Sequence, residues 1–392
     1  MSAFLQFVRA ELPTVRGETY LNAGGAGPLP RCTVTAIQAA AEHALGQGRG
    51  SLSEYLAIEE ARAHLRSQLA DLIGGAASEI ALTTSATSGL CQTIWGLDWR
   101  EGDEAITTNL EHPGLTVPLA VLARRRGVRI RTVELETGGE PLEERVAALA
   151  GPRTRLVALS HVAWTTGAQM DVAGAARAAR QVGAFVLIDG AQGIGAIAAE
   201  PRLLGVDAYA FPAQKWLLGP EGLGGLWVAQ EALERIDLTF GGMGSGAAHG
   251  LDGSVTLHPD ARKLELGVLP EFLVPGWSAS LDWLAGCRDG DEPQGLTGWE
   301  WTAQQTARSI AQARTVLGSA GATVLTPPGG AAGLLAFTLA GVDVEAATAT
   351  LAARGIVLRW VPQPRALRIS IGFFTDEHDL ARLAAGLDDL TG

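Results

Sequence analysis

The sequence predicts an α/β protein, with a large domain built on a mainly parallel, seven-stranded sheet and a smaller C-terminal α+β domain. Short apolar runs rich in β-branched residues alternate with Ala-, Arg- and Leu-rich runs of helical period. This alternation is typical of parallel strands joined by helices. The pattern changes after a glycine-dense stretch at 241–253, and a chain of 392 residues is long enough for more than one core.

The expected elements follow from these runs in chain order. The strands of the large sheet are predicted at 80–83, 104–108, 129–133, 156–160, 184–189, 208–211 and 225–228. Helices between them are predicted at 59–72, 115–125, 142–149 and 172–181. We interpret the stretch 241–253 as a mobile loop. Beyond it, the smaller domain is predicted from helices at 302–317 and 344–353 and strands at 334–338 and 367–371.

Composition and charge exclude several classes of protein. A hydrophobic content of 47% with 18% charged residues excludes a disordered chain. Apolar runs are too short to span a bilayer, and Met1–Leu12 lacks the apolar core of a signal peptide, so we expect a cytoplasmic protein without a membrane partner. The net charge of −12, with no basic stripe, argues against nucleic acid as a partner. The three cysteines are too widely spaced to predict a metal site or a disulfide framework.

Lysine is rare in this chain. Of the 30 basic residues only Lys215 and Lys263 are lysines, and the others are arginines. A guanidinium stays protonated, whereas an amine can lose its proton and form an imine with an aldehyde. A retained lysine is therefore a candidate for covalent chemistry, although two lysines can also survive by chance.

The apolar run at 184–189 ends in Asp189, and Gln192 follows after a glycine and an alanine. A carboxylate at the end of a buried strand needs a cationic or protonated partner, because burial alone raises its pKa. The N–H of a pyridinium ring is such a partner, and keeping this ring protonated makes pyridoxal phosphate (PLP) an electron sink. A strand-end aspartate can also simply cap the following turn.

Lys215 comes just after the next strand candidate, and a glycine-rich stretch follows it at 219–225. One crossover unit separates Lys215 from Asp189, so both side chains are expected at the same edge of the sheet. In this mostly apolar segment the amine should have a lowered pKa and be nucleophilic. An exposed lysine at the start of a helix would give the same pattern.

Three further segments place polar residues near strands. Ser85, Ala86 and Thr87 lie in a hydroxyl-rich turn before a helix, where backbone N–H groups bind phosphate, although an ordinary N-cap explains the same residues. His112 follows a strand and is suited to stack on a flat ring and relay protons, although a single histidine is more often structural. Arg368 lies in an apolar strand and suits a substrate carboxylate or an internal salt bridge.

A competing motif lies at 193–198, where the sequence matches the dinucleotide-binding pattern G-x-G-x-x-A after a strand. Asp189 and Gln192 occupy the start of that turn, and Pro201 interrupts the helix that should follow. The motif is therefore weak evidence for a dinucleotide site.

Together and in this order, these segments resemble the class V aminotransferase family of fold-type I PLP enzymes. The resemblance runs from Tyr20-Leu-Asn-Ala-Gly-Gly-Ala-Gly-Pro-Leu-Pro30 to Arg368, and includes the Asp-Gly-Ala-Gln and Lys-Trp segments. The family contains cysteine desulfurases, isopenicillin N epimerase-like proteins and cysteine/cystine C–S lyases, and Glu111-His-Pro-Gly114 looks most like the last branch. The resemblance implies a large PLP-binding domain at 17–255 and a small domain formed by 1–16 and 256–392.

The resemblance also implies a role for each candidate residue. Lys215 would form the Schiff base with PLP and move protons. The implied PLP-binding residues are Ser85, Ala86, Thr87, His112, Asp189, Gln192, Gln214 and Lys215. Asp189 would face the pyridine nitrogen, Gln192 the phenolic oxygen, and His112, the second implied catalytic residue, would stack on the ring. Arg368 would bind the α-carboxylate of a small amino-acid substrate, and the protein would be a homodimer with its site at the subunit interface.

Three departures from the family pattern bear on function. The segment 359–365 lacks the persulfide-forming cysteine of cysteine desulfurases, which argues against persulfide transfer to a scaffold protein. Pro212 and Gln214 stand where the family usually has Ser and His, and Val268 stands where it has a Thr lent by the partner subunit. Losing two hydroxyl donors should weaken the phosphate site, which would then depend on Ser85 and backbone amides.

These features lead to a first hypothesis, a PLP-dependent C–S β-lyase acting on cysteine, cystine or a related sulfur amino acid. The products would be pyruvate, ammonia and sulfide or persulfide. The alternative is an epimerase or aminotransferase on the same scaffold. A third hypothesis is a catalytically weakened protein of this fold that serves as a scaffold, and its support is limited to Pro212 and Val268.

Overall fold

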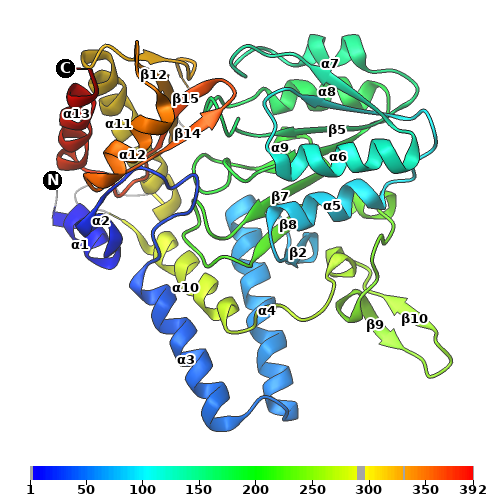
Figure 1. The fold of residues 1–392 in the computed structure, drawn as a ribbon. Helices are drawn as coiled ribbons and strands as arrows, with labels where there is room; N and C mark the ends of the chain where they lie inside the picture. The colour runs from blue at the N-terminus through cyan, green and yellow to red at the C-terminus, as the bar shows by residue number, and fades with distance from the viewer. Residues whose placement is uncertain (1–2, 289–295, 330–331, 392) are drawn as a thin grey trace.

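A seven-stranded sheet forms the centre of the larger part of the molecule (Figure 1). The computed structural model describes residues 3–288, 296–329 and 332–391. The strands are β2 (Ile80–Thr83), β3 (Glu104–Thr108), β4 (Arg129–Val133), β5 (Thr154–Ser160), β6 (Phe185–Asp189), β7 (Ala208–Pro212) and β8 (Gly224–Val228). They lie in the order β2-β8-β7-β6-β5-β3-β4, and only β8 runs antiparallel to its neighbours. The predicted sheet is confirmed, with strand ends that differ by at most two residues.

Helices cover this sheet and explain why its central strands are continuous apolar runs. The connecting helices are α5 (Ala86–Gly96), α6 (Pro113–Arg126), α7 (Glu143–Leu149), α8 (Val172–Gln181) and α9 (Pro201–Leu204). Helix α5 packs against β7 and β8, and α8 packs against β5 and β6. Every residue of β6 and β7 is buried, because parallel strands covered on both faces have no solvent side.

Three long helices form a second layer, α3 (Arg31–Gln47), α4 (Leu52–Ile73) and α10 (Leu273–Gly286). Helix α10 packs against both others, and the joined ends of α3 and α4 project away from the sheet (Figure 1). Arg66 of α4 forms a buried ion pair with Glu265, whose Oε1 also accepts a hydrogen bond from the backbone N–H of Leu82 on the edge strand β2. The segment around 265 is thereby fixed to the edge of the sheet.

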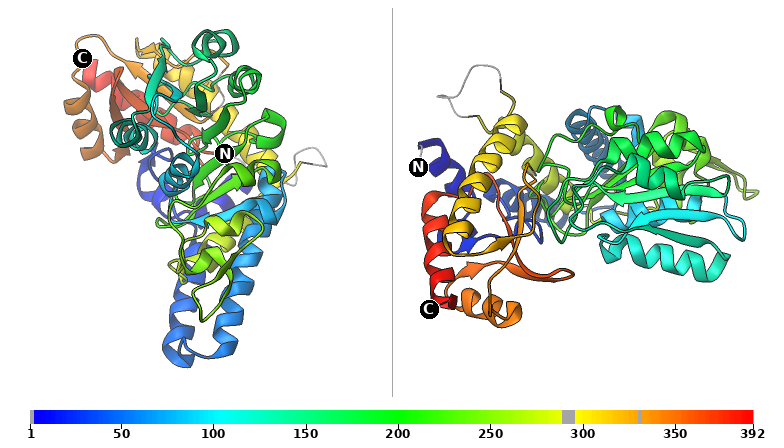
Figure 2. Two further views of the ribbon diagram at one scale, coloured as in Figure 1. Left: turned by 90° about the vertical axis from the view of Figure 1, so that its right-hand side faces the viewer. Right: turned by 90° about the horizontal axis from the view of Figure 1, so that it is seen from above.

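The second part of the molecule is a four-stranded antiparallel sheet, ordered β11-β12-β15-β14. Its strands are β11 (Thr323–Val324), β12 (Leu334–Thr338), β15 (Arg365–Ser370) and β14 (Arg359–Pro362), accompanied by α11 (Gly298–Ser319), α12 (Val344–Ala353) and α13 (Glu377–Thr391). Figure 2 shows this part at one end of the molecule and the large sheet at the other.

The N-terminal segment packs against the small domain. It contains α1 (Ala3–Glu11), α2 (Thr14–Gly17) and β1 (Thr19–Tyr20), and β1 pairs in parallel with β13 (Ile356–Val357). Arg9 donates hydrogen bonds to the carboxylate of Asp379, 2.6 Å away, and to the carbonyl of Phe374. Both visible chain ends therefore lie on the same side of the molecule (Figure 1).

The core of the large sheet includes residues beyond the predicted division at residue 256. Ala261, Leu264, Val274 and Trp277 pack in the same apolar core as the seven-stranded sheet. We therefore propose that the small domain begins after α10. We also propose that strand β1, which pairs with β13, belongs to the small domain. The sequence placed the boundary at the glycine-dense stretch because composition changes there, whereas the core continues beyond it.

The glycine-dense stretch is a correction to the sequence-based interpretation. The expected mobile loop contains a short 3-10 turn followed by strand β9 (Gly246–His249), which pairs antiparallel with β10 (Val255–Leu257). Gly253 has a φ of 84°, which favours glycine, and the carboxylate of Asp252 accepts a hydrogen bond from the N–H of Ser254. The glycines belong to a hairpin and its turn.

None of the helices in the described part of the chain combines the length and apolar character needed to cross a bilayer.

Candidate active site

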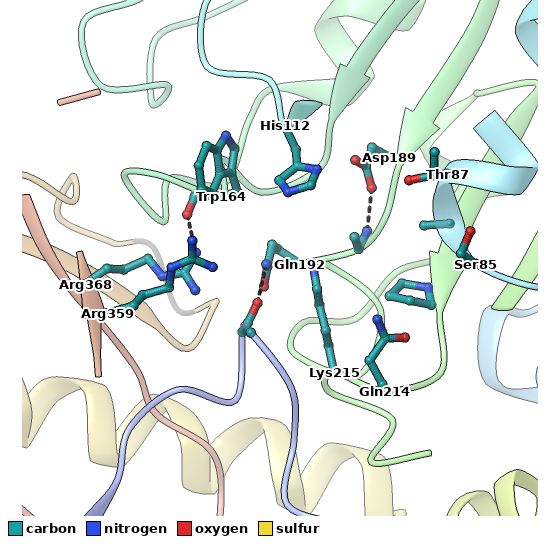
Figure 3. Close-up of a pocket in the computed structure, with 15 residues that line it drawn as sticks. Ser85, Thr87, His112, Trp164, Asp189, Gln192, Gln214, Lys215, Arg359 and Arg368 are labelled. Carbon is teal, nitrogen blue, oxygen red and sulfur yellow. Dashed lines mark hydrogen bonds between the residues drawn. The ribbon is translucent and has the colours of Figure 1, made fainter. Parts of the chain in front are cut away.

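One cavity of about 250 Å³ lies at the carboxyl edge of the large sheet, next to the small domain. All nine site residues expected from the sequence line it, namely Ser85, Ala86, Thr87, His112, Asp189, Gln192, Gln214, Lys215 and Arg368. In Figure 3, Ser85 and Thr87 lie on one side, Arg359 and Arg368 on the other, and Lys215 between them. The cavity therefore has an end formed by a helix N-terminus and an end formed by two guanidinium groups.

Asp189 and Lys215 reach the cavity from neighbouring strands. Asp189 is the last residue of β6, and Lys215 follows the end of β7, which pairs with β6. Burial raises the pKa of Asp189, although Lys215 and a hydrogen bond from the N–H of Ala191 oppose this effect. Burial lowers the pKa of Lys215 to about 8, against the opposing effect of Asp189. The expected pairing of a strand-end acid and a reactive amine in one cavity is thus present.

The turn after Asp189 is shaped by close packing against Tyr209. A Cβ atom added to Gly193 would lie 2.4 Å from the Tyr209 hydroxyl, and one added to Gly190 would lie 1.9 Å from its ring. Tyr209 is fully buried and its hydroxyl lies 2.9 Å from Nδ1 of His161. The glycines of this turn are therefore required by the space that Tyr209 occupies beneath it.

Gln192 connects two segments that border the cavity. Its amide nitrogen donates to the carbonyl of Gly24, 2.8 Å away, and its amide oxygen accepts from the indole N–H of Trp216 at 2.9 Å. The N–H of Gly27 also donates to the carbonyl of Gln214. The N-terminal segment is thereby fixed beside Lys215, a contact that sequence analysis did not anticipate. The expected role of Gln192 toward a cofactor oxygen remains a prediction.

The N-terminus of α5 forms one end of the cavity. Ser85 is the N-cap residue, and its hydroxyl accepts a hydrogen bond from the N–H of Ser88 at 3.0 Å. The N–H groups of Ala86 and Thr87 belong to the first turn, where no helical carbonyl is available to them. Such an end attracts anions through these donors and the helix dipole. Pro212, which lines the same region, offers no N–H and no hydroxyl.

His112 is held in one orientation by the helix that follows it. It is the N-cap of α6, and its Nδ1 accepts a hydrogen bond from the N–H of Gly114 at 3.0 Å. Because Nδ1 is an acceptor, the proton of the neutral ring is assigned to Nε2. Burial, followed by the charge of Lys215, lowers the pKa of His112 to about 4, so the ring is neutral near pH 7. The ring also makes an edge contact with Trp164, with centroids 5.1 Å apart.

Arg368 is fully buried and has unused hydrogen-bond donors. Its Nη1 donates to the carbonyl of Trp164 at 2.5 Å, whereas Nε and Nη2 have no partner among the described residues. Burial and the nearby Arg359 lower its pKa to about 9. An unpaired buried guanidinium is costly, and a carboxylate ligand would satisfy both free donors.

Arg359 was not identified as a site residue from the sequence, because a single arginine in the run Arg-Trp-Val-Pro has no distinguishing signal. It lines the cavity beside Arg368, since the two residues are directly paired across β14 and β15. Its guanidinium lies over the ring of Trp164, 5.6 Å from the centroid. Across residues 3–288, 296–329 and 332–391, neither arginine forms an ion pair with a carboxylate. Its place in the site comes from the pairing of β14 with β15, which local sequence does not show.

The competing dinucleotide motif is not supported by its surroundings. Residues 193–197 form turns with an isolated bridge between Ile194 and Ile197, and α9, the next helix, begins at Pro201 and is four residues long. A dinucleotide site needs a helix N-terminus directly after the glycine turn to receive the pyrophosphate. That helix is absent at this place in the described chain.

The donor set of this cavity fits PLP. The buried acid Asp189 suits the ring nitrogen, and the buried amine of Lys215 suits the aldehyde. The neutral ring of His112 suits the ring face, and the free amides at the N-terminus of α5 suit the phosphate. The unpaired donors of Arg368 then remain available for a substrate.

Comparisons with known proteins agree with this geometry. The family model "Aminotransferase class-V" matches residues 19–383. A probable cysteine desulfurase of Methanothermobacter thermautotrophicus is 32% identical over 71% of this chain and 69% of that protein. The isopenicillin N epimerase of Streptomyces clavuligerus is 32% identical over 95% of this chain and 94% of its own length.

Solved structures give the same result for the three-dimensional fold. A mutant of C-DES with glycine covalently linked to the PLP cofactor has a TM-score of 0.91 and 29% identity, covering 97% of this chain and 99% of that one. The complex of the cystine C–S lyase C-DES with its reaction product cysteine persulfide has a TM-score of 0.90 at 29% identity. Since the family model covers nearly the whole chain and the relatives align along most of their length, this protein belongs to the class V aminotransferase family.

Proposed function

We propose that this protein is a PLP-dependent C–S β-lyase acting on cysteine, cystine or a related sulfur amino acid, and giving pyruvate, ammonia and sulfide or persulfide. The observation that carries the proposal is the single cavity shared by Lys215, Asp189 and the unpaired donors of Arg368. The similarity to the cystine C–S lyase C-DES over nearly the whole chain supports it.

Four groups of the cavity would hold PLP. Lys215 would bond its aldehyde carbon, Asp189 would accept the ring N–H, and His112 would lie against the ring. The amides of Ala86 and Thr87, with Ser85, would bind the phosphate. When bound, PLP supplies an electron sink that weakens the Cα–H bond of an attached amino acid. The side chain of Gln214 also lines the cavity, and its amide group would be a further donor to the cofactor.

Lys215 is the base of this proposal. With a pKa of about 8, roughly a tenth of the amine is unprotonated at pH 7, which is far more than for a lysine in water. The neutral amine can take a proton from the α-carbon and return it to a leaving group. Asp189 stays ionised when it faces a protonated ring, because the ring charge offsets the desolvation that raises its pKa.

His112 acts as a donor in this arrangement. Its Nδ1 accepts from the Gly114 N–H, so the proton of the neutral ring is assigned to Nε2. A neutral imidazole in this tautomer donates a hydrogen bond at Nε2 and accepts none there. The α-proton would therefore go to Lys215, and His112 would hold the ring by lying against it.

The two arginines favour a substrate with acidic groups. Arg368 offers Nε and Nη2 to an α-carboxylate, in the forked geometry that suits bidentate binding. Arg359, stacked on Trp164, provides a second cation in the same cavity. Cystine carries two α-carboxylates, so this pair supports cystine above cysteine as the substrate.

The cysteines support release of sulfur as a small molecule. Cys32, Cys91 and Cys287 are all described by the structure, and none of them lines the cavity. With cystine as substrate, one C–S bond breaks and water is consumed, so that pyruvate, ammonia and cysteine persulfide leave. No thiol of this chain is placed to take over the sulfur.

The alternative function is an epimerase, which the similarity to isopenicillin N epimerase favours. Epimerisation returns a proton to the opposite face of the α-carbon and releases no pyruvate. Incubating the protein with single enantiomers of sulfur and non-sulfur amino acids separates the two activities, because chiral chromatography detects inversion and a coupled assay detects pyruvate.

A homodimer acting in the cytoplasm is also part of the proposal. The segment from 240 to 268 exposes several large apolar side chains, a common property of surfaces that bind another subunit. They are Phe240, Met243, Leu251, Val255, Leu257, Leu266 and Val268. Cell fractionation tests the location, and sedimentation tests the assembly.

The central experiment is an absorbance scan of the protein with PLP, followed by an assay of sulfur amino acids for pyruvate. The wild-type protein should gain a visible band and release pyruvate. Lys215→Ala should lose that band and at least about a hundredfold of its turnover, the usual contribution of a positioned proton-transfer group. Lys263→Ala is the control, since Lys263 donates to the carbonyls of Leu233 and Ile236 and does not line the cavity. Unchanged turnover in Lys215→Ala would reject the mechanism.

A further inference from the structure

Glu111 is a buried carboxylate beside the site that no step above uses. Its Oε2 accepts hydrogen bonds from the backbone N–H of Ser160 at 2.8 Å and from the Ser160 hydroxyl at 2.5 Å. Its Oε1 accepts from the hydroxyl of Thr108 at 2.6 Å. Burial raises the pKa of Glu111 to about 7 despite these donors. One side chain thus satisfies three donors away from solvent.

These contacts join neighbouring strands at the carboxyl edge of the sheet. Thr108 is the last residue of β3 and Ser160 is the last residue of β5, and these two strands are adjacent. Ser160 is in turn directly paired with Asp189 on β6. Glu111 therefore links Thr108 at the end of β3 to Ser160 at the end of β5, which lies beside Asp189.

Glu111 also fixes the peptide that leads to His112. The loop between Thr108 and His112 is tied back at Glu111, and His112 then begins α6 as its N-cap. A small cavity of about 10 Å³ lies between His112, Ser160, Asp189 and Lys215. Ser160 thus borders the site on one side while its hydroxyl contacts Glu111.

We propose that Glu111 is a positioning residue, which sets the separation between the His112 ring and the Asp189 carboxylate and so shapes the space for a flat ring between them. The inference rests on the proposed use of PLP. Glu111 acts through Ser160 and His112 and does not itself contact a ligand.

The test compares Glu111→Ala with Glu111→Gln. A carboxamide fits the same contacts, because its oxygen can accept both bonds from Ser160 and its NH₂ can donate to a reoriented Thr108 hydroxyl. Alanine removes all three and leaves the Ser160 N–H without a partner. We expect the PLP dissociation constant to be at least about tenfold higher for Glu111→Ala and within about threefold of the wild-type value for Glu111→Gln. Fluorescence titration of the apoprotein gives these constants.

A second readout separates positioning from general stability. The visible circular dichroism of bound PLP depends on how the ring is held, and it should fall in Glu111→Ala at saturating PLP and recover in Glu111→Gln. The matched control is Glu79→Gln, a buried glutamate that accepts from the N–H groups of Ala76 and Gln230 far from the cavity. It should lower the melting temperature and leave the PLP signal unchanged.

The outcomes are distinguishable. If Glu111→Ala does not fold, Ser160→Ala removes one of the three donors and should weaken PLP binding in the same direction. Equal PLP affinity and dichroism in wild type, Glu111→Ala and Ser160→Ala would overturn the inference, as would a Glu111→Gln protein as weak as Glu111→Ala. A wild-type protein that binds no PLP would instead contradict the proposed function.

Discussion

The reactivity of Lys215 with an aldehyde should depend on pH in a way that reports its surroundings. The neutral amine is the reacting form, and its fraction rises with pH until the pH is about one unit above the pKa. Because burial lowers this pKa to about 8, uptake of PLP by the apoprotein should accelerate from pH 6 through pH 8, where half of the amine is neutral, and level off above about pH 9. Stopped-flow absorbance measures the rate. A rise that continues toward pH 10 would mean that the amine is solvated.

The two arginines should contribute differently to substrate binding. Arg368→Met removes both free donors, and hydrogen bonds to charged groups contribute about 1.5–3 kcal/mol, so KM should rise about 10- to 150-fold for every amino acid tested. Arg359→Met should lower kcat/KM for cystine about tenfold more than for cysteine, because only cystine has a second carboxylate. Steady-state assays with both substrates measure this. Equal losses for cystine and cysteine would contradict a separate role for Arg359.

At the level of single residues, the sequence identified reactive side chains where a suitable residue type stands at the end of a predicted strand, as for Asp189 and Lys215. Both lysines are conspicuous among the arginines, and the position of Lys215 after a strand distinguishes it in the sequence. In the structure Lys215 lines the cavity, whereas Lys263 donates to two backbone carbonyls. Arg359 could not be found in the same way, because its importance comes from pairing with Arg368 across a hairpin. Long-range pairing is not visible in local sequence.

Among the structural elements, the turn after β6 is the most constrained by packing. In Gly193→Ala, the new methyl group would lie 2.4 Å from the Tyr209 hydroxyl, so the turn that carries Asp189 and Gln192 must shift. We expect PLP affinity to fall about tenfold or more, by the cost of overpacking a core. Tyr209→Phe removes the clashing oxygen, so the Gly193→Ala, Tyr209→Phe double variant should recover part of the affinity. Fluorescence titration with PLP measures all three, and a double variant no better than Gly193→Ala would argue against this clash.

The elements themselves were predictable where local pattern and tertiary packing agree. The strands β6 and β7 are buried on both faces, which requires the apolar runs that identify them in the sequence. The hairpin β9–β10 was missed because glycine density is shared by loops and by hairpin turns, and its strands are exposed. Side-chain burial gives no pattern where a strand has no buried face.

For the whole molecule, composition and packing place the proposed boundary between the two domains at different residues. Composition changes near 255, whereas the core under the large sheet includes Trp277 and Leu281 of α10. The ion pair of Arg66 with Glu265 ties this later segment to α4 and the sheet edge. Such contacts join residues about two hundred positions apart, and only the folded chain reveals them.

The exposed apolar segment at 240–268 leads to a prediction for the assembly. In a two-fold dimer a single substitution appears twice in the interface, so Val268→Asp would bring two carboxylates into an apolar contact. Val268 is 75% exposed in the single chain. We expect Val268→Asp to shift sedimentation from dimer toward monomer and to weaken PLP binding, because the site is proposed to lie at that interface.

The matched control for this experiment is Leu203→Asp, since Leu203 is 76% exposed but lies on α9, outside the 240–268 segment. This variant should sediment and bind PLP like the wild-type protein. If both variants dissociate, the added charge acts through general destabilisation, which thermal unfolding would reveal. If Val268→Asp remains a dimer at the wild-type affinity, the interface lies on another face, and the exposed apolar residues of this segment need a different explanation.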